Sequence, residues 1–317
     1  MAADQQAVAP PGSRRTRAGT GNAQTLLASE RRFGYMIIAP LLIVLLVITA
    51  YPLVYNIWNS FQHDNLLSFQ RGFAGLANYS ELFTNNQFLP ALEHTFAFTV
   101  VSVIIEMVIG LGIALALNKP FRGRGVVRAA VLIPWAVPTV VSAELWRTMF
   151  DPQQGFVNFV LTKLHLPLAS TTWLDSNWTA WTAILIADAW RNTPFVAIVL
   201  LAGLQVIPGD IYEAAKIDGA NAWQTFRRLT LPLLKPALMV ALIFRTIQSF
   251  MIFDVVYIMT NGGPGTSTNV LALLDYRAYF YVLDYGYGGA ISVSLVVIAL
   301  LIAGIYVRVF RVEPAAA

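Results

Sequence analysis

The stretch YGYGGAISVSLVVIALLIAGIYV, residues 285–307, contains no charged side chain and decides the class of fold. A lipid bilayer has a hydrocarbon core about 30 Å thick, which an α-helix crosses in about 20 apolar residues. Inside that core every backbone N–H and C=O group needs a partner within the protein, and a helix supplies all of them by itself. The stretch is therefore predicted to be a transmembrane helix.

The composition of the whole chain agrees with this prediction. Of its 317 residues, 57% are hydrophobic and 12% are charged, whereas about 25% of the residues of a typical soluble protein are charged. The mean hydropathy is +0.61. So little polar surface excludes a soluble enzyme, a disordered chain and a nucleic-acid-binding protein. The absence of cysteine excludes disulfides, thiolate metal sites and a cysteine nucleophile.

Five further apolar segments precede this stretch, without the short alternating pattern of a β-barrel. We therefore predict an all-α, polytopic membrane protein with six transmembrane helices. The predicted spans are residues 33–61, 92–117, 126–150, 178–205, 236–260 and 285–307. Residues 1–32 are predicted to form a disordered basic tail, residues 33–311 the six-span domain and residues 312–317 a second tail. The first apolar run is too long for a cleaved signal peptide.

Basic residues are distributed unequally between the two sides of the predicted membrane. With the N-terminus inside, fifteen of the 21 Lys and Arg residues lie on the inner side and four on the outer side, while Arg191 and Arg245 lie within spans. Cytoplasmic segments of membrane proteins carry such an excess of Lys and Arg. Both termini and the loop 206–236 are therefore predicted to be cytoplasmic.

The loop 206–236 contains signals for two short helices. Asp210 and Glu213 have the spacing of a capping box, and Gly219 is a natural C-terminal stop for the helix that follows. Asn221 can cap a second helix, which Pro232 would end. We predict a compact helix pair on the inner face. It is either a surface feature without a partner or a docking point whose alanines allow close approach.

The same loop resembles a family signature. Its pattern Glu213-Ala-Ala-x-x-x-Gly219, followed after nine residues by Leu229-x-Leu-Pro232, is similar to the EAA loop of ABC-importer permeases. The longer pattern Tyr212-Glu-Ala-Ala-x-x-Asp-Gly-Ala220 is similar to that of the carbohydrate (MalF-like) subfamily. Further stretches that resemble this family are Leu132–Pro138, Phe150–Gly155, Trp190–Phe195 and Thr260–Pro264. The resemblance extends over residues 33–311.

The resemblance implies a permease subunit of an ATP-driven, binding-protein-dependent sugar importer in a bacterial inner membrane. Its substrate would be a di- or oligosaccharide of the trehalose or maltose type. In this family two homologous permeases pair, and two ATP-binding cassette subunits dock on their EAA loops. An extracytoplasmic binding protein delivers the sugar. The ATPase-coupling residues would be Tyr212, Glu213, Ala214, Ala215, Asp218, Gly219 and Ala220.

The chain itself is expected to be no enzyme and to hold no cofactor, metal or catalytic residue. It lacks a Gly-x-x-x-x-Gly-Lys-Ser/Thr loop, which cradles nucleotide phosphates. ATP and Mg²⁺ would therefore bind to the partner ATPases and not to this chain. His94 and His165 have no carboxylate or His partner at ligand spacing, which disfavours a metal site.

Polar residues inside the predicted spans follow helical spacing. Charged groups in a membrane usually face protein or a water-filled path. One stripe comprises Asp188, Arg191, Asn192 and Phe195, a second comprises Arg245, Gln248, Ser249 and Ile252, and Trp135 and Thr139 are one turn apart. The resemblance matches these ten positions to sugar-contacting places in the family.

Several alternatives stay open at this point. Asp188 and Arg191 could pair with each other and only stabilise the bundle. Two arginines would also suit phosphate, as in a glycerol-phosphate or polyol importer. Glu106 is expected to make an interhelical or interfacial contact. A multi-pass membrane enzyme would need a cluster of catalytic groups, and the sequence contains none that we can identify.

Overall fold

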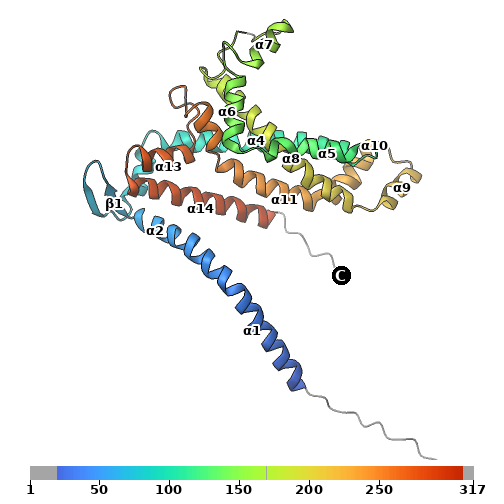
Figure 1. Ribbon diagram of the computed structural model, residues 1–317, viewed down its shortest axis with the longest axis horizontal. Helices are drawn as coiled ribbons and strands as arrows, with labels where there is room; N and C mark the ends of the chain where they lie inside the picture. Colours follow the sequence, from blue (N-terminus) through green and yellow to red (C-terminus); the bar gives the residue numbers. More distant parts are fainter. Residues whose placement is uncertain (1–19, 169, 310–317) are drawn as a thin grey trace, which may run out of the picture. The chain divides into compact units, whose positions relative to one another are not determined.

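The computed structural model describes residues 20–168 and 170–309, and helices dominate them (Figure 1). The chain divides into two compact units, residues 1–55 and 56–317. The first unit contains α1 (Thr20–Leu45), the π-helical turn η1 (Leu46–Ala50) and most of α2 (Tyr51–Asn59). Helix α1 includes residues 20–32 of the predicted N-terminal tail. Residues 1–19 and the predicted C-terminal tail lie outside the described residues.

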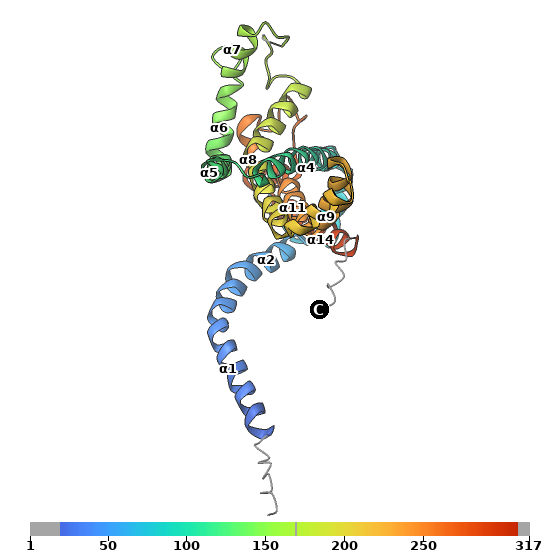
Figure 2. The same cartoon turned by 90° about the vertical axis from the view of Figure 1, so that its right-hand side faces the viewer.

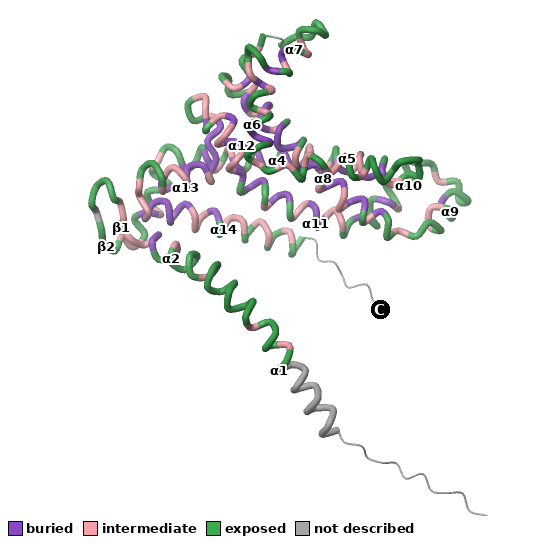
Figure 3. Tube along the Cα trace, in the orientation of Figure 1, coloured by how far each residue is buried: buried purple, intermediate pink, exposed green. Residues whose placement is uncertain are grey.

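The first predicted span is an apolar helix with little internal packing. Residues 33–59 are long and apolar enough to cross a membrane, and their side chains are largely exposed (Figure 3). Tyr51 and Tyr55 stack at a ring distance of 6.2 Å near its end. A helix that is apolar on all sides is stable when hydrocarbon surrounds it.

The second unit is a bundle of long helices with short elements at their ends. Helices α4, α8 and α11 pack against one another, and α14 packs against α11 and α13, whereas α6 and α7 project away from α11 and α14 (Figures 1 and 2). Its helices are α3 (Ala77–Thr84), α4 (Phe88–Asn118), α5 (Arg124–Ala136), α6 (Thr139–Met149), α7 (Phe156–Lys163), α8 (Asn177–Val206), α9 (Gly209–Ile217), α10 (Ala222–Thr225), η2 (Phe226–Thr230), α11 (Leu231–Phe250), α12 (Asp254–Met259), α13 (Leu271–Phe280) and α14 (Tyr285–Val309).

The six predicted spans are confirmed, with one of them broken. Within the described residues, five helices are long and apolar enough to span a membrane. They are residues 33–59, 88–118, 177–206, 222–250 and 285–309. The sixth is the pair α5 and α6, which passes the same test only when both helices are taken together.

The prediction of one continuous third helix is wrong. Helices α5 and α6 meet at an angle of 90°. Pro138 has no N–H to donate, and it forces Val137 before it into an extended conformation, with ψ of 132°. Helix α5 therefore ends at Ala136, and the chain restarts at Thr139 in a new direction.

The predicted limits of the fifth span are also wrong. The helical run begins at Ala222 and continues through η2 into α11, which ends at Phe250. The residues after it form a separate short helix, α12. The run breaks at Met251, whose φ of −96° and ψ of 22° lie outside the helical region, and Phe253 is the N-cap residue of α12.

One small β-hairpin adds to the all-α fold. Strands β1 (Gln62–Asn65) and β2 (Gln70–Phe73) pair antiparallel, with Gln62 opposite Phe73. Asn65 donates to the Asp284 carboxylate at 2.8 Å, which ties the hairpin to the start of α14. The hairpin lies in the connection between the first two spans, where hydropathy carries no signal.

Small residues allow the central helices to approach closely. A Cβ atom added at Gly203 of α8 would lie 2.4 Å from the Ala237 Cβ of α11, and one at Gly110 of α4 would lie 2.7 Å from a Val196 methyl. Helices in membranes associate through such small-residue contacts, because apolar burial gives little gain in lipid. The centre of the bundle is fully buried around Leu200, Leu204 and Leu234.

Candidate functional site

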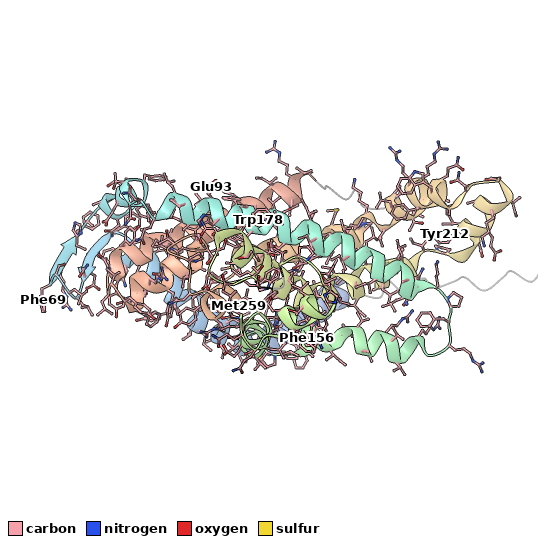
Figure 4. The ribbon with its side chains drawn as sticks, turned by 90° about the horizontal axis from the view of Figure 1, so that it is seen from above. Phe69, Glu93, Phe156, Trp178, Tyr212 and Met259 are labelled. Carbon is pink, nitrogen blue, oxygen red and sulfur yellow. The ribbon has the colours of Figure 1, made fainter. Side chains whose placement is uncertain are left out.

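The loop 206–236 contains the two predicted short helices, α9 and α10. Figure 4 shows Tyr212 of α9 at one end of the bundle and Phe69, at the tip of the β-hairpin, at the other. The loop and the hairpin therefore lie at opposite ends of the spans.

The predicted capping box at the start of α9 is wrong. Pro208 occupies the N-cap position and no side chain caps the helix, because Asp210 already lies inside the first turn. A carboxylate in that turn still interacts favourably with the helix dipole. Glu213 is exposed and has no hydrogen bond to the backbone of the first turn.

The predicted stop at Gly219 is confirmed. Gly219 has φ of +76°, which suits a residue without a Cβ atom. The N–H of Ala220 donates to the Ala215 carbonyl at 2.9 Å, and that of Gly219 donates to the Lys216 carbonyl at 3.1 Å. These two bonds close the end of α9 in a Schellman-like turn and direct the chain toward α10.

The second helix starts as predicted but does not end at Pro232. Asn221 and Gln224 form a reciprocal capping box, with bonds of 2.9 and 3.0 Å. The chain then runs through η2 directly into α11. The wider π turn accommodates the backbone carbonyl that Pro232 cannot satisfy, so the helix continues.

The α9–α10 pair presents large apolar side chains at its surface. Ile217 is 86% exposed and Trp223 is 65% exposed, while Ala214 is exposed and Ala215 is buried. The hydroxyls of Tyr212 and Thr230 share a hydrogen bond of 3.3 Å, which ties α9 to the start of α11. Both large apolar side chains are therefore accessible to a partner protein.

A buried network of charged and polar side chains connects three spans. Arg245 of α11 and Glu106 of α4 are 2% and 0% exposed. The guanidinium donates from Nε and Nη2 to the two Glu106 oxygens at 2.5 and 2.7 Å. Its Nη2 also lies 3.3 Å from Asp188 Oδ2 of α8. The same guanidinium donates to Gln248 at 2.8 Å and to Ser249 at 3.0 Å.

Asp188 and Arg191 do not pair with each other, so that alternative is wrong. Asp188 accepts from Asn192 at 2.8 Å and faces Arg245. Arg191 donates to the Asn192 oxygen at 3.0 Å and to the Val137 carbonyl at 3.4 Å. That carbonyl is free for Arg191 because helix α5 ends there.

Aromatic and polar side chains meet on one accessible face of α5, α8 and α11. Trp135 stacks on Phe195 at a ring distance of 5.9 Å, and Phe195 contacts Phe244 at 4.6 Å. Trp135 is 45% and Phe244 43% exposed, and Gln248 beside them is exposed as well. We call Trp135, Phe195, Phe244, Arg191 and Gln248 the aromatic–polar face. It combines ring surfaces with hydrogen-bond donors and an acceptor.

Three of the predicted positions lie elsewhere than expected. Trp135 and Thr139 are not one turn apart on a helix, because the break at Val137 separates them. Ile252 lies beyond the end of α11 and packs in an apolar cluster with Phe98. It is therefore absent from the stripe of Arg245, which ends with Ser249.

Sequence reasoning assigned Glu106 only a general contact and missed Phe244. Glu106 is the strongest partner of Arg245, but it lies 139 residues away in the chain, so no local spacing reveals it. Phe244 directly precedes Arg245, and a helix places adjacent residues on different faces. The position of Phe244, an aromatic residue next to a polar stripe, is the sequence feature that could have indicated its role.

Two other features concern possible ligand sites. An apolar cavity of about 550 Å³ lies between α4, α5 and α8, lined by side chains such as Ile109, Leu185 and Pro194, and none of the stripe's charged residues lines it. Within residues 20–168 and 170–309, no group of three or more His, Asp or Glu side chains is arranged to hold a metal ion. Neither feature adds a polar group to the aromatic–polar face.

The turn after α6 is a tight loop stabilised by one carboxylate. Asp151 accepts from the backbone N–H groups of Gln154 and Gln153 at 2.8 and 2.9 Å. These bonds hold the pKa of Asp151 below its usual value. A Cβ atom at Gly155 would lie 2.3 Å from the Asp151 carbonyl, so only glycine fits there.

Two relatives named as transport permeases are similar over most of this chain. The trehalose/maltose transport system permease protein MalF of Thermococcus litoralis is 44% identical over 282 residues, which are 89% of this chain and 95% of that protein. The trehalose transport system permease protein SugA of Mycobacterium tuberculosis is 38% identical over 283 residues, which are 89% and 90% of the two chains.

The solved structures agree on the fold. A chain of the bacterial alginate ABC transporter, crystallised with an alginate pentasaccharide-bound periplasmic protein, matches with a TM-score of 0.77 and 24% identity. The match covers 88% of this chain and 94% of that one. Residues 108–312 match the family described as the inner membrane component of binding-protein-dependent transport systems. The chain therefore belongs to this family of ABC-importer permeases and is a membrane transport subunit, not an enzyme.

Proposed function

We propose that this permease forms half of the pathway of an importer for a di- or oligosaccharide of the trehalose or maltose type. The aromatic–polar face is the observation that carries the proposal. Aromatic rings pack on the apolar faces of sugar rings, while Gln248 and Arg191 can bond to hydroxyls. Relatives named for trehalose and maltose transport support this substrate class.

The face lies on the surface of a single chain, and a second permease would complete the pathway around it. We propose a heterodimer with a homologous permease, two ATP-binding cassette subunits that hold ATP and Mg²⁺, and an extracytoplasmic binding protein. The exposed Ile217 and Trp223 suit docking of an ATPase on the α9–α10 pair. ATP-driven movement of that pair would then tilt the spans around the sugar.

Both termini are proposed to be cytoplasmic, which the absence of native cysteines makes simple to test. Cysteine introduced at Ser170 should react with a membrane-impermeant maleimide added from outside, and cysteine at Ala222 should not. Both positions are exposed, so burial does not protect either of them. Labelling in intact cells and again after permeabilisation measures the difference. The reverse labelling pattern would contradict the proposed topology and place both termini outside.

The substrate assignment predicts weaker trehalose uptake when the aromatic–polar face is truncated. Gln248→Ala removes one hydrogen-bonding group, worth about 1 kcal/mol, so transport should fall roughly fivefold. Trp135→Ala should have a similar effect. Trp178→Ala is the matched control, since Trp178 is 81% exposed at the far start of α8. Uptake of labelled trehalose into proteoliposomes that contain the complete complex measures the change.

The same assay separates sugar from a phosphorylated polyol. Unlabelled maltose should compete with trehalose, and glycerol 3-phosphate should not. Competition by glycerol 3-phosphate alone, or unchanged uptake in both face variants, would contradict the assignment of a neutral sugar to this face.

A further inference from the structure

Glu106 holds Arg245 in the strongest geometry available to the network. Its two oxygens accept from Nε and Nη2 of the guanidinium at 2.5 and 2.7 Å, a bidentate pair between two fully buried groups. Such paired, charge-assisted bonds are stronger and more directional than single contacts. Glu106 is therefore the principal counterion of Arg245.

Asp188 is held much more loosely by the same guanidinium. Arg245 Nη2 carries two hydrogens and faces three acceptors: Glu106 at 2.7 Å, Ser249 at 3.0 Å and Asp188 at 3.3 Å. The Asp188 contact is the longest of the three. Its side chain is 10% exposed, whereas that of Glu106 is 0% exposed.

Asp188 thus keeps hydrogen-bonding capacity that Glu106 has already used. A carboxylate has about four lone-pair sites. One Asp188 oxygen accepts from Asn192 at 2.8 Å, and the other has the long contact with Arg245. The Glu106 carboxyl group also lies within hydrogen-bonding reach of Asp188, and these neighbours together leave part of the lone-pair capacity of Asp188 unused. Through Asn192 this carboxylate is linked to Arg191, which belongs to the aromatic–polar face.

We infer that Glu106 is a positioning residue that neutralises Arg245 and thereby leaves Asp188 free to accept a hydroxyl of the transported sugar. This inference rests on the proposed function of the aromatic–polar face. Without the Glu106 charge, Arg245 would have Asp188 as its remaining counterion at 3.3 Å. A strong Arg245–Asp188 pair would then occupy the oxygen that the sugar needs.

The inference predicts that Glu106→Gln changes the effect of Asp188→Asn in opposite ways for trehalose binding and for the melting temperature. Asp188→Asn should weaken trehalose binding about tenfold in the native background and have no further effect in Glu106→Gln, where Asp188 is already captured. For thermal stability, Asp188→Asn should have the larger effect in the Glu106→Gln background. Asp188→Asn should lower the melting temperature slightly in the native background and strongly in Glu106→Gln, where Asp188 is the remaining counterion.

The experiment uses the complex of both permeases and the ATPase subunits, purified without the binding protein and trapped with ATP and vanadate. Labelled trehalose retained per complex gives the binding, and the melting temperature of each variant gives the stability. Glu93→Gln, an exposed change on the same helix, is the matched control and should alter neither.

If the complex with Glu106→Gln alone fails to assemble, a double variant that also removes the Arg245 charge still tests the inference. In Glu106→Gln with Arg245→Gln no excess positive charge remains, so trehalose binding should persist and should still depend on Asp188. Loss of binding in this pair, or additive effects of Glu106→Gln and Asp188→Asn in both measurements, would mean that Glu106 is only structural. No retained trehalose in the native complex would instead overturn the sugar assignment, while the melting temperatures would still test the division of charge.

Discussion

Replacing Gly219 by valine is expected to lower uptake on the order of tenfold while all spans still insert. Gly219 has φ of +76°, and a Cβ atom there would meet nothing within 4 Å. A steric clash therefore cannot cause the effect, which arises from the strain of a positive φ at a residue other than glycine. A β-branched residue in this region costs about 1–2 kcal/mol, which shifts the docking equilibrium on the order of tenfold. The turn that directs α9 toward α10 would be less stable, and docking of the ATPase would weaken by that factor.

Gly219→Asn is the matched control for this prediction, since asparagine tolerates the left-handed conformation and should retain most of the transport. Uptake, membrane abundance and co-purified ATPase subunits are measured for both variants. If valine at this position supports normal uptake at equal abundance, the α9–α10 pair has no part in coupling. Loss of abundance in both variants would point to a general folding defect.

Hydropathy and charge predicted the spans but not their breaks. The number of spans follows from apolar length, which depends on composition alone and is insensitive to local geometry. The 90° bend between α5 and α6 depends on how the bundle uses Pro138, and Pro232 and Pro236 lie in a run that stays helical. The same residue type therefore ends one helix and is accommodated in another. Only the surrounding packing separates the two cases.

The polar residues show a similar limit. Helical spacing placed Asp188 and Asn192 together, and they do bond across one turn of α8. Spacing could not pair Arg245 with Glu106, because that contact joins two helices that lie far apart in the chain. Helical spacing also does not show which residues of one stripe are buried and which are accessible. Arg245 and Ser249 are buried, whereas Gln248 between them is exposed.

The division between a buried network and an accessible face changes the assignment of the predicted substrate residues. Arg245 and Ser249 are buried inside the bundle. Trp135, Phe195 and Gln248 reach its surface, and Thr139 stays a prediction without a specific contact. The two carboxylates beside Arg245 more than balance its single charge, so Arg191 is the cation of the aromatic–polar face, which weakens the case for a phosphorylated substrate.

Replacing Arg245 by methionine is expected to destabilise the packing of α4, α8 and α11 strongly. Methionine replaces the unbranched aliphatic stem of arginine but leaves Glu106 and Asp188 close together without a cation. Removing one partner of a buried ion pair costs about 3–5 kcal/mol, because the remaining charge stays buried. The free energy of unfolding of a typical domain is only about 5–15 kcal/mol, so little intact complex should remain.

Two further variants decide whether the charge or the shape of Arg245 matters. Adding Glu106→Gln to Arg245→Met removes the more deeply buried of the two carboxylate charges and should restore most of the complex. Arg191→Met is the control on α8. Arg191 is only half-buried and bonds to uncharged oxygens, so its loss should lower uptake with little effect on the melting temperature. Melting temperature and membrane abundance are measured for all three variants. If Arg245→Met is as stable as Arg191→Met, the network does not hold α4, α8 and α11 together, because a buried pair of unneutralised carboxylates could not persist without an energetic cost.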